Sequence, residues 1–322
     1  MANDNLYIVV PCFNEQEALQ VTNDILLHQL DALIQAHKVS CASKVLYVDD
    51  GSTDHTWDVI SNIVLKSKRV LGVRLAANSG QQNALMAGLE ASVNRADVMI
   101  TIDADLQDDC TVMAQMMSEY DRGCDVVYGV RSVRRSDSWF KRNTAQVFYR
   151  MMHRLGVNTV YNHADFRLMS KRAVNHLLSF RERNLFLRGI VPLVGFCSSQ
   201  VRYDRAARMA GESKYSFHKM LSFAVDGITS FSIKPVRMVF SLGLVFLLIA
   251  LGILIYTLIA YFTHRAVSGW SSLMLSLWFI GGCVLMSLGI VGEYIGKIYI
   301  EVKDRPRYYV DATLGFDDIT ED

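Results

Sequence analysis

Two aspartates one residue apart, Asp103 and Asp105, directly follow an apolar run at 98–102. If that run is a strand, its alternating side chains place both carboxylates on the same side of the backbone. Two negative charges this close repel each other unless a positive group lies between them. A hard divalent cation that keeps positions open for phosphate oxygens meets this need. The pair therefore predicts a metal site, with an acidic turn before a helix from about Cys110 as the alternative.

Strand-like apolar runs alternate with helical patterns through the first 130 residues. The runs lie at 6–10, 45–48, 70–75, 98–102 and 125–130, and the helical patterns at 15–36, 54–65, 81–93 and 111–122. This alternation predicts an α/β fold, with a mostly parallel sheet between helices on both faces.

Polar side chains follow four of these predicted strands. They lie in the segments 11–15, 49–52, 78–80 and 103–105. Ligands of parallel sheets bind beyond the carboxyl ends of the strands, where these segments would meet. Four polar strand ends at one edge of a sheet indicate a single binding site and favour the metal interpretation of Asp103 and Asp105.

Several common site motifs are absent from the sequence. No G-x-G-x-x-G follows the first strand and no G-x-x-x-x-G-K-S/T occurs, which counts against a dinucleotide dehydrogenase and a P-loop nucleotidase. The six cysteines show no C-x-x-C spacing and the histidines do not cluster, so we expect no zinc site. The first apolar run is too short for a signal peptide and lacks its basic flank.

The charge of the chain is unevenly distributed. Residues 1–130 contain 18 acidic and 8 basic residues, whereas residues 131–219 contain 5 acidic and 18 basic residues. An acidic first part and a basic middle suggest a metal and nucleotide site followed by a surface for anions. Nucleic acid is one candidate for that anion, and a phosphorylated lipid or an anionic membrane surface is the other.

Two segments of 24 residues, 239–262 and 269–292, contain no Asp, Glu, Lys or Arg. As helices they would each reach about 36 Å, enough to cross a hydrocarbon core of about 30 Å. Basic residues flank their outer ends, and the positive-inside rule then places both termini in the cytoplasm. Before the pair, 215–233 shows an amphipathic pattern that predicts helices in the inner interface, or alternatively a core-facing helix.

Several longer motifs occur in order along the chain. They are VVPCFNE at 9–15, VDDGSTD at 48–54, DADLQD at 103–108, DFRLMS at 165–170, ERNLF at 182–186, GESKY at 211–215, GEYIGKIY at 292–299 and RPRY at 305–308. With these motifs the chain resembles family-2 glycosyltransferases of the GT-A fold. It is most similar to polyprenyl-phosphate glycosyltransferases of the bactoprenol-phosphate subgroup, and dolichol-phosphate mannose synthase is similar over the soluble part.

The resemblance covers nearly the whole chain and implies its organisation. It implies a GT-A domain at 1–212, amphipathic juxtamembrane helices at 213–235, two transmembrane helices within 236–292 and a cytoplasmic tail at 293–322. It also implies a multi-pass protein of the bacterial inner membrane with its catalytic domain and both termini in the cytoplasm. Membrane lipid and further copies of the chain, as a homotetramer, are the implied partners, and nucleic acid is not.

The resemblance implies an inverting transfer of a sugar from a UDP-sugar to undecaprenyl phosphate at the inner leaflet. Glucose is the expected sugar, for O-antigen modification of lipopolysaccharide, and N-acetylglucosamine and 4-amino-arabinose derivatives remain alternatives. A polysaccharide synthase would usually carry more membrane spans and a Q-x-x-R-W motif, and neither is found. A non-catalytic membrane scaffold is the other alternative, against which the intact aspartate pair counts.

The resemblance also assigns the donor site. The implied nucleotide-sugar contacts are Pro11, Asn14, Glu15, Asp49, Asp50, Gly80, Asp103 and Gln107. Carboxylates at 49 and 50 can accept hydrogen bonds from the uracil N–H and the ribose hydroxyls, although capping of the helix from Asp54 is an alternative role. Asp103 and Asp105 would bind Mg²⁺ or Mn²⁺, with Asp105 the more direct ligand. The metal would offset the charge on departing UDP.

The acceptor side is assigned to Asp165 and to a group of cations. A phosphate monoester with a second pKa near ~6 is mostly dianionic at neutral pH, so a strong base is less necessary than for an alcohol. We therefore expect Asp165 to orient the sugar or the acceptor, with proton removal or an ion pair with Arg167 as alternatives. The candidate phosphate ligands are Arg131, Arg134, Arg205, Arg208 and Lys214, of which the last two flank 211–213 and are favoured.

Overall fold

The computed structural model describes residues 4–131, 163–204 apart from 184 and 186, scattered positions between 236 and 255, and 269–316. The chain forms two compact units, which are described separately. The first comprises Met1–Gln146, Thr159–Lys214 and Arg305–Asp322, and the second comprises Val147–Asn158 and Tyr215–Asp304.

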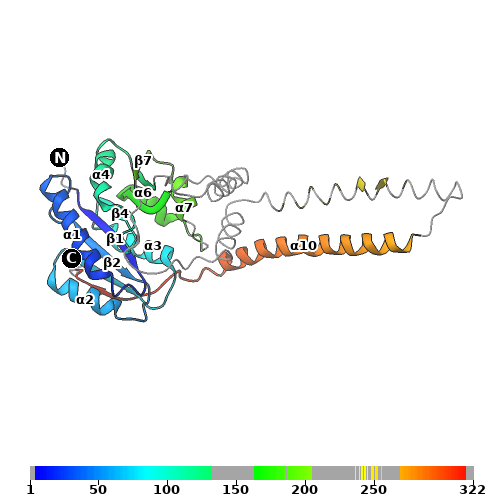
Figure 1. Cartoon of the computed structure of the whole chain (residues 1–322), viewed down its shortest axis with the longest axis horizontal. Coiled ribbons are helices and arrows are strands. Elements are labelled where there is room, and N and C mark those ends of the chain that lie inside the picture. Colours follow the sequence, from blue (N-terminus) through cyan, green and yellow to red (C-terminus); the bar gives the residue numbers. More distant parts are fainter. Residues whose placement is uncertain are drawn as a thin grey trace. The chain divides into compact units, whose positions relative to one another are not determined.

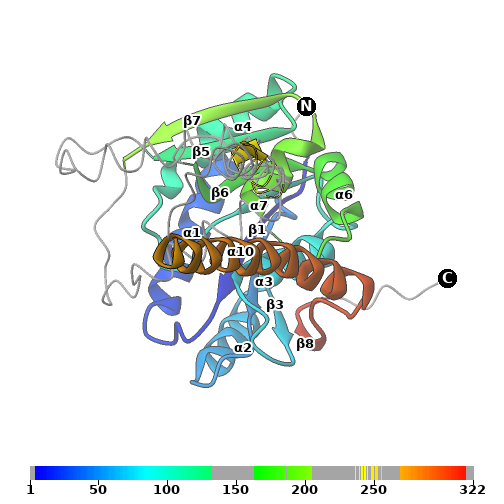
Figure 2. The ribbon, with the colours of Figure 1, turned by 90° about the vertical axis from the view of Figure 1, so that its right-hand side faces the viewer.

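The first unit is built on a sheet in which eight strands are described. In chain order they are β1 (Leu6–Cys12), β2 (Lys44–Asp49), β3 (Val70–Leu75), β4 (Val98–Thr101), β5 (Val126–Arg131), β6 (His163–Ser170), β7 (Ser198–Tyr203) and β8 (Val310–Leu314). Their order across the sheet is β7-β5-β6-β4-β1-β2-β3-β8. Figure 2 labels β7, β5, β6, β1, β3 and β8 in this order from top to bottom.

Most of these strands run in one direction. β1 pairs in parallel with β2 and β4, β2 with β3, and β5 with β7. β6 is antiparallel to β4 and β5, and β8 is antiparallel to β3. The amino end of β6 therefore lies at the same sheet edge as the carboxyl ends of β1, β2 and β4. The predicted α/β fold with a mostly parallel sheet is confirmed.

Helices connect the strands and cover the sheet (Figure 1). They are α1 (Leu19–Gln35), α2 (Thr56–Lys66), α3 (Gln81–Ser92), α4 (Met113–Asp121), α6 (Lys171–Ser179) and α7 (Leu187–Ile190), with 3₁₀ turns at Cys110–Val112 and Val191–Val194. Alternate residues of β1 separate two core layers. Ile8 belongs to the core cluster that contains Leu26 and Leu30 of α1, whereas Val9 faces Gly88 of α3 on the other side. The predicted helix at 15–36 begins only at Leu19.

The last strand, β8, comes from the tail that follows the second unit in the chain. It pairs with the edge strand β3, and the amide of Ala76 donates to the carbonyl of Tyr309 at 2.9 Å. Strand β8 has the sequence VDATL, which alternates apolar and polar residues, but the run is only five residues long and largely exposed, and it was not predicted. Backbone pairing, rather than burial of side chains, makes this segment a strand.

The second unit is described mainly through α10 (Trp270–Val302), a helix of 33 residues. Within the described part of the chain, one helical segment, Phe279–Val302, is long and apolar enough to cross a membrane. The helix starts one residue after the predicted span at 269–292 and continues ten residues beyond it. The other predicted span, 239–262, is described only at scattered positions, and the amphipathic segment 215–233 lies outside the described residues.

Candidate functional site

The loop after β2 is fixed against the loop before α3 by a buried carboxylate. Asp50 accepts hydrogen bonds from the backbone amides of Ser79 at 2.7 Å and Gly80 at 2.9 Å. Gly51, which directly follows Asp50, lies in the left-handed region with φ +64°. A β-carbon there would be 2.6 Å from the carbonyl carbon of Ala77. Only glycine fits this close approach without a backbone shift.

The neighbouring carboxylate, Asp49, is fully buried but only partly satisfied. One of its oxygens accepts the amide of Ser52 at 3.2 Å. Its Oδ2 accepts no hydrogen bond from the described residues, and the Nε of Arg74 lies 3.7 Å away. Burial raises the pKa of Asp49 and of Asp50. Because buried oxygens normally have a donor, Oδ2 of Asp49 is a suitable acceptor for a ligand N–H or O–H group.

The end of β1 is fastened to the same loop. Asn14, with φ 56°, donates its amide to Ser52 Oγ at 3.0 Å and accepts from the amide of Thr53 at 2.9 Å. The amide of Glu15 donates to Thr56 Oγ1 at 2.9 Å. These contacts bring the predicted donor-site residues of β1 and β2 together at one sheet edge.

Neither Asp49 nor Asp50 caps α2, which was their alternative role. The N-cap residue is His55, and Asp54 before it accepts the amide and the hydroxyl of Thr56, the first residue of α2, at 3.0 and 2.6 Å. Pro11 lies buried inside β1, opposite Val48 of β2. The assignment of Pro11 and of the other donor-site residues to a nucleotide sugar stays a prediction.

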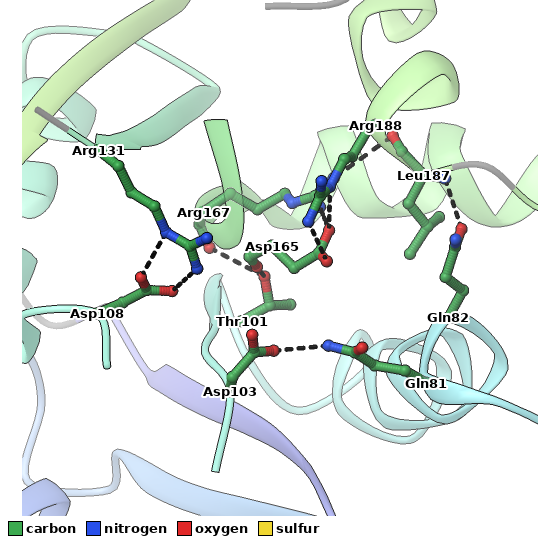
Figure 3. Close-up of polar contacts among 10 residues, drawn as sticks. All are labelled: Gln81, Gln82, Thr101, Asp103, Asp108, Arg131, Asp165, Arg167, Leu187 and Arg188. Atoms are coloured by element: carbon green, nitrogen blue, oxygen red, sulfur yellow. Dashed lines mark hydrogen bonds and ion pairs between the residues drawn. The ribbon is translucent and has the colours of Figure 1, made fainter. Parts of the chain in front are cut away.

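The aspartate pair that follows β4 is held by two glutamines. Gln81 donates its side-chain amide to Asp103 Oδ1 at 2.7 Å (Figure 3), and Gln107 donates to Asp105 Oδ2 at 2.8 Å. Leu106, which lies between Asp105 and Gln107 in the chain, has φ 43°. This conformation costs free energy for a bulky residue, and such residues are found mainly at functional sites. Gln107 thus contacts Asp105, while its predicted contact with the nucleotide sugar stays a prediction.

The predicted repulsion between carboxylates is present at this strand end. Loss of solvent, followed by the charges of Asp165, Asp108 and Asp105, raises the pKa of Asp103 to about 7. Among the described residues, no group of three His, Cys, Asp or Glu side chains could hold a metal ion. Two carboxylates at an open edge nevertheless fit Mg²⁺ or Mn²⁺, which commonly take one or two protein carboxylates and complete their shell with substrate phosphates and water.

Asp165 lies beside Asp103 because of the register between β4 and β6. Thr101 is paired with Arg167 in that register, and two residues further along each strand lie Asp103 and Asp165. The hydroxyl of Thr101 donates to the Asp165 carbonyl. Asp165 Oδ1 accepts from Arg167, and its Oδ2 accepts from Arg188 at 3.1 Å (Figure 3). The ion pair with Arg167 considered from the sequence is therefore present, and Arg188 is a second partner.

Of the five predicted phosphate ligands, only Arg131 lies in the described part of the chain. Its Nε and Nη2 donate to the two carboxylate oxygens of Asp108 at 2.9 and 3.1 Å. This two-point pair places Arg131 at the same sheet edge and neutralises a further carboxylate there. Arg134, Arg205, Arg208 and Lys214 lie outside the described residues.

The sequence did not predict several residues of this cluster, among them Gln81, Gln82, Asp108 and Arg188. Gln82 accepts the amide of Leu187 at 2.8 Å, although 105 residues separate them in the chain. Arg188 directly follows the motif at 182–186, and that position was the available signal for it. Nothing local in the sequence connects Gln82 with Leu187, because their contact depends on how α3 and α7 pack.

Comparisons with known proteins agree over most of the chain. A family model described as glycosyl transferase family 2 matches residues 7–178, and one described as the GtrB C-terminal hairpin matches residues 234–298. The chain is 50% identical to the uncharacterized glycosyltransferase YkoT of Bacillus subtilis, over 96% of this chain and 92% of that protein. It is 36% identical to the SfII prophage-derived bactoprenol glucosyl transferase of Shigella flexneri, over 94% of this chain and 96% of that protein.

Among solved structures, the mannosyltransferase PcManGT from Pyrobaculum calidifontis, in complex with GDP-mannose and Mn²⁺, is 14% identical to this chain. It matches with a TM-score of 0.49 and covers 74% of this chain and 65% of its own.

Proposed function

This chain belongs to glycosyltransferase family 2, and from that membership we propose that it transfers glucose from UDP-glucose to undecaprenyl phosphate. Relatives at 35–36% identity over nearly the whole chain bear the name bactoprenol glucosyl transferase, which supports this acceptor and this sugar. The matched hairpin region at 234–298 supports the same subgroup.

The observation that carries the proposal is the buried Oδ2 of Asp49, which has no hydrogen-bond donor in the described structure. The uracil ring presents an N–H that can donate to such an oxygen, and ribose presents hydroxyls. Asp50 is fixed beside it by two backbone amides, so the nucleotide would enter a preformed site. Asp103 and Asp105, at the same edge, lie where the diphosphate would follow.

Asp103 and Asp105 would hold Mg²⁺ or Mn²⁺. The bound cation would stabilise the negative charge that develops on the UDP leaving group. Gln81 and Gln107 hold the two carboxylates in position through side-chain hydrogen bonds. Their neutral amides leave the negative charge of both carboxylates available to a cation.

The reaction itself needs little proton transfer. An oxygen of the dianionic lipid phosphate attacks the anomeric carbon, the bond from that carbon to the UDP oxygen breaks, and the configuration inverts. Both carboxylate oxygens of Asp165 accept from guanidinium groups, which supports an orienting role over that of a general base. Positioning and preorganised charge would then supply most of the rate enhancement.

The second unit would anchor the enzyme at the inner leaflet, where the lipid phosphate lies. Its apolar helix segment Phe279–Val302 supports a membrane span, and we propose that 239–262 forms the other half of a hairpin. Residues 303–309 are all that separates α10 from β8, so the chain leads directly from the anchor into the catalytic sheet. Cytoplasmic termini, interfacial helices at 213–235 and a homotetramer belong to the same proposal.

Transfer of radioactivity into lipid tests the proposed function. Purified protein is incubated with carbon-14-labelled UDP-glucose, Mg²⁺ and undecaprenyl phosphate, and the organic phase is counted. We expect labelled lipid that depends on the metal. The absence of product with UDP-glucose, UDP-N-acetylglucosamine and a UDP-4-amino-arabinose derivative would overturn the reaction class.

The metal assignment is tested by Asp105→Asn, which we expect to reduce turnover by about 10³-fold, since it removes charge stabilisation from the leaving group. Asp109→Asn is the matched control. Asp109 is only partly buried and caps the 3₁₀ turn at Cys110–Val112, and asparagine caps equally well. Activity of Asp105→Asn equal to that of the control would contradict the assignment.

A further inference from the structure

Arg188 projects from α7 toward the carboxylate cluster at the edge of the sheet. Its Nη2 lies 3.1 Å from Asp165 Oδ2 and its Nε lies 3.5 Å from Oδ1 (Figure 3). The Arg188 side chain is 36% exposed, whereas that of Asp165 is 13% exposed. The guanidinium of Arg188 is thus held by Asp165 and is also accessible to solvent.

Asp165 already has a charge partner in Arg167. The Arg167 side chain is 2% exposed and its Nη2 donates to Asp165 Oδ1. A buried carboxylate needs one buried cation to balance it. Arg188 is the more exposed of the two guanidinium groups, so it is the one that a ligand can reach.

The sheet order places this charge on the side of the site away from the predicted nucleotide contacts. Asp49 ends β2 and Asp50 follows it, whereas Asp165 lies near the start of β6, and β1 and β4 lie between these two strands. The register of β4 and β6 puts Asp165 next to Asp103. A nucleotide at the β2 end with its diphosphate near Asp103 therefore leaves the β6 side, with Arg188, for the second substrate.

The backbone that carries Arg188 is braced on both sides of the preceding residue. The amide of Leu187 donates to Gln82 Oε1 at 2.8 Å, and the carbonyl of Leu187 accepts from Arg167 Nη1 at 3.4 Å (Figure 3). A surface arginine that only solvates the protein does not need such support. A cation that must meet a ligand in one geometry gains from it, because less freedom is lost on binding.

From these contacts we propose that Arg188 binds the phosphate group of the lipid acceptor, and that Asp165 is the residue that positions it. The inference rests on the proposed function, since it names the acceptor ligand of that same site. Guanidinium presents paired N–H donors that match two oxygens of a phosphate monoester. Asp165 occupies one edge of the Arg188 guanidinium and so fixes the direction in which the group can meet the phosphate.

The test separates the Michaelis constants of the two substrates. Loss of a charge-assisted contact in Arg188→Met should raise the KM for undecaprenyl phosphate by about tenfold or more, with the KM for UDP-glucose within about twofold of wild type. The KM of Arg188→Lys for undecaprenyl phosphate should lie between those of wild type and Arg188→Met. Arg122→Met is the control, because Arg122 is an exposed arginine that likewise pairs with a carboxylate, Glu119, on α4.

A rise in the KM for UDP-glucose, with that for the lipid unchanged, would assign Arg188 to the donor diphosphate and overturn the proposal. Unchanged values for both substrates would overturn it as well. If Arg188→Met no longer binds UDP and is therefore misfolded, the KM for the lipid in Arg188→Lys decides in its place.

A binding measurement keeps this inference separate from the proposed function. Geranyl phosphate is titrated into the full-length protein in the presence of UDP and Mg²⁺, and its heat of binding is recorded. We expect wild type and Arg122→Met to bind it and Arg188→Met to bind at least about tenfold more weakly. Equal binding by all three proteins would refute the role of Arg188 even if the wild type transferred no sugar.

Discussion

The two sides of the candidate site are held together by different kinds of contact. On the nucleotide side, the carboxylate of Asp50 is fixed by the backbone amides of Ser79 and Gly80. On the β6 side, the carboxylate of Asp165 is fixed by the side chains of Arg167 and Arg188. One side is therefore built from loop conformation and the other from charge balance.

This difference bears on what each side can offer a substrate. Backbone amides are neutral, so Asp49 and Asp50 keep their negative charge for the N–H and O–H donors of a ligand. On the β6 side, Arg188 is the more exposed of the two guanidinium groups that contact Asp165, so that side can offer a cation to an anion. The two sides should consequently fail in different ways when single residues are changed.

The largest effect is expected from Asp165→Asn. The substitution leaves Arg167 buried next to Arg188 without its counter-charge. Burial is the main cause that lowers the pKa of Arg167, the charge of Asp165 opposes it, and the charge of Arg188 lowers the pKa further. Removing one member of a buried ion pair should lower the free energy of unfolding by about 3 kcal/mol. Thermal unfolding of the purified protein measures this loss.

Asp50→Asn is the matched comparison for that prediction. The asparagine oxygen can still accept one backbone amide, and no buried cation loses its counter-charge. We expect a loss of about 1 kcal/mol, because one backbone amide loses its hydrogen-bond acceptor. Equal losses of stability in the two variants would show that charge balance does not distinguish the β6 side.

The same difference explains how much could be predicted from the sequence. The α/β fold, strands β1 to β5 and helices α1 to α4 were predicted, because buried strands carry long apolar runs and the helices have a regular apolar face. Asp49, Asp50, Asp103 and Asp105 follow such strands directly, so a local pattern was sufficient to place them at one sheet edge.

The β6 side could not be predicted in this way. Asp165 reaches Asp103 only through the antiparallel register of β6 and β4, and Gln82 reaches Leu187 only through the packing of α3 and α7. Ion pairs and hydrogen bonds between distant segments leave no periodic pattern in either segment. Strand β8 was missed although its sequence, VDATL, alternates apolar and polar residues, because the run is short and its side chains are mostly exposed.

Gly51→Ala tests whether the nucleotide side depends on loop conformation. A β-carbon would lie 2.6 Å from the Ala77 carbonyl carbon at a residue with φ +64°. Strain at such a position should cost about 2 kcal/mol and should displace Asp50 from its amide donors. We expect a lower melting temperature and the loss of stabilisation by UDP and Mg²⁺, both measured by thermal unfolding.

Gly123→Ala provides the control for that substitution. Gly123 also has a positive φ, +94°, but a β-carbon there would have no atom of the described residues within 4 Å. Only the conformational cost, about 1 kcal/mol, should remain, and stabilisation by UDP should be intact. If Gly123→Ala and Gly51→Ala lost UDP stabilisation alike, the close approach at Gly51 would not be the cause.

The smallest effect is expected at a second carboxylate–guanidinium pair, at the opposite edge of the sheet. Asp125 accepts from Ser170 Oγ and from Arg172 Nε, both at 2.8 Å. Unlike Arg167, the Arg172 side chain is 66% exposed. Hydrogen bonds from Arg172, followed by that from Ser170, hold the pKa of Asp125 below its usual range. Water screens this pair, so it should stabilise the protein much less than the Asp165 pair.

The pH dependence of stability separates the small contribution of Asp125 from other effects. Because the pKa is lowered in the folded state, the stabilisation is present above the unfolded pKa near ~3.9 and is lost as the pH falls through the folded value. Asp125→Asn should therefore lower the melting temperature by no more than about 3 °C at pH 7, and the difference should vanish once the pH lies below the pKa of Asp125 in the folded state. A difference from wild type that grew on acidification would mean that Asp125 is stabilised by something other than its ionised pair with Arg172. If Asp125→Asn lost as much stability at pH 7 as Asp165→Asn, burial of the partner arginine would not explain why the β6 side is sensitive to the loss of a charge.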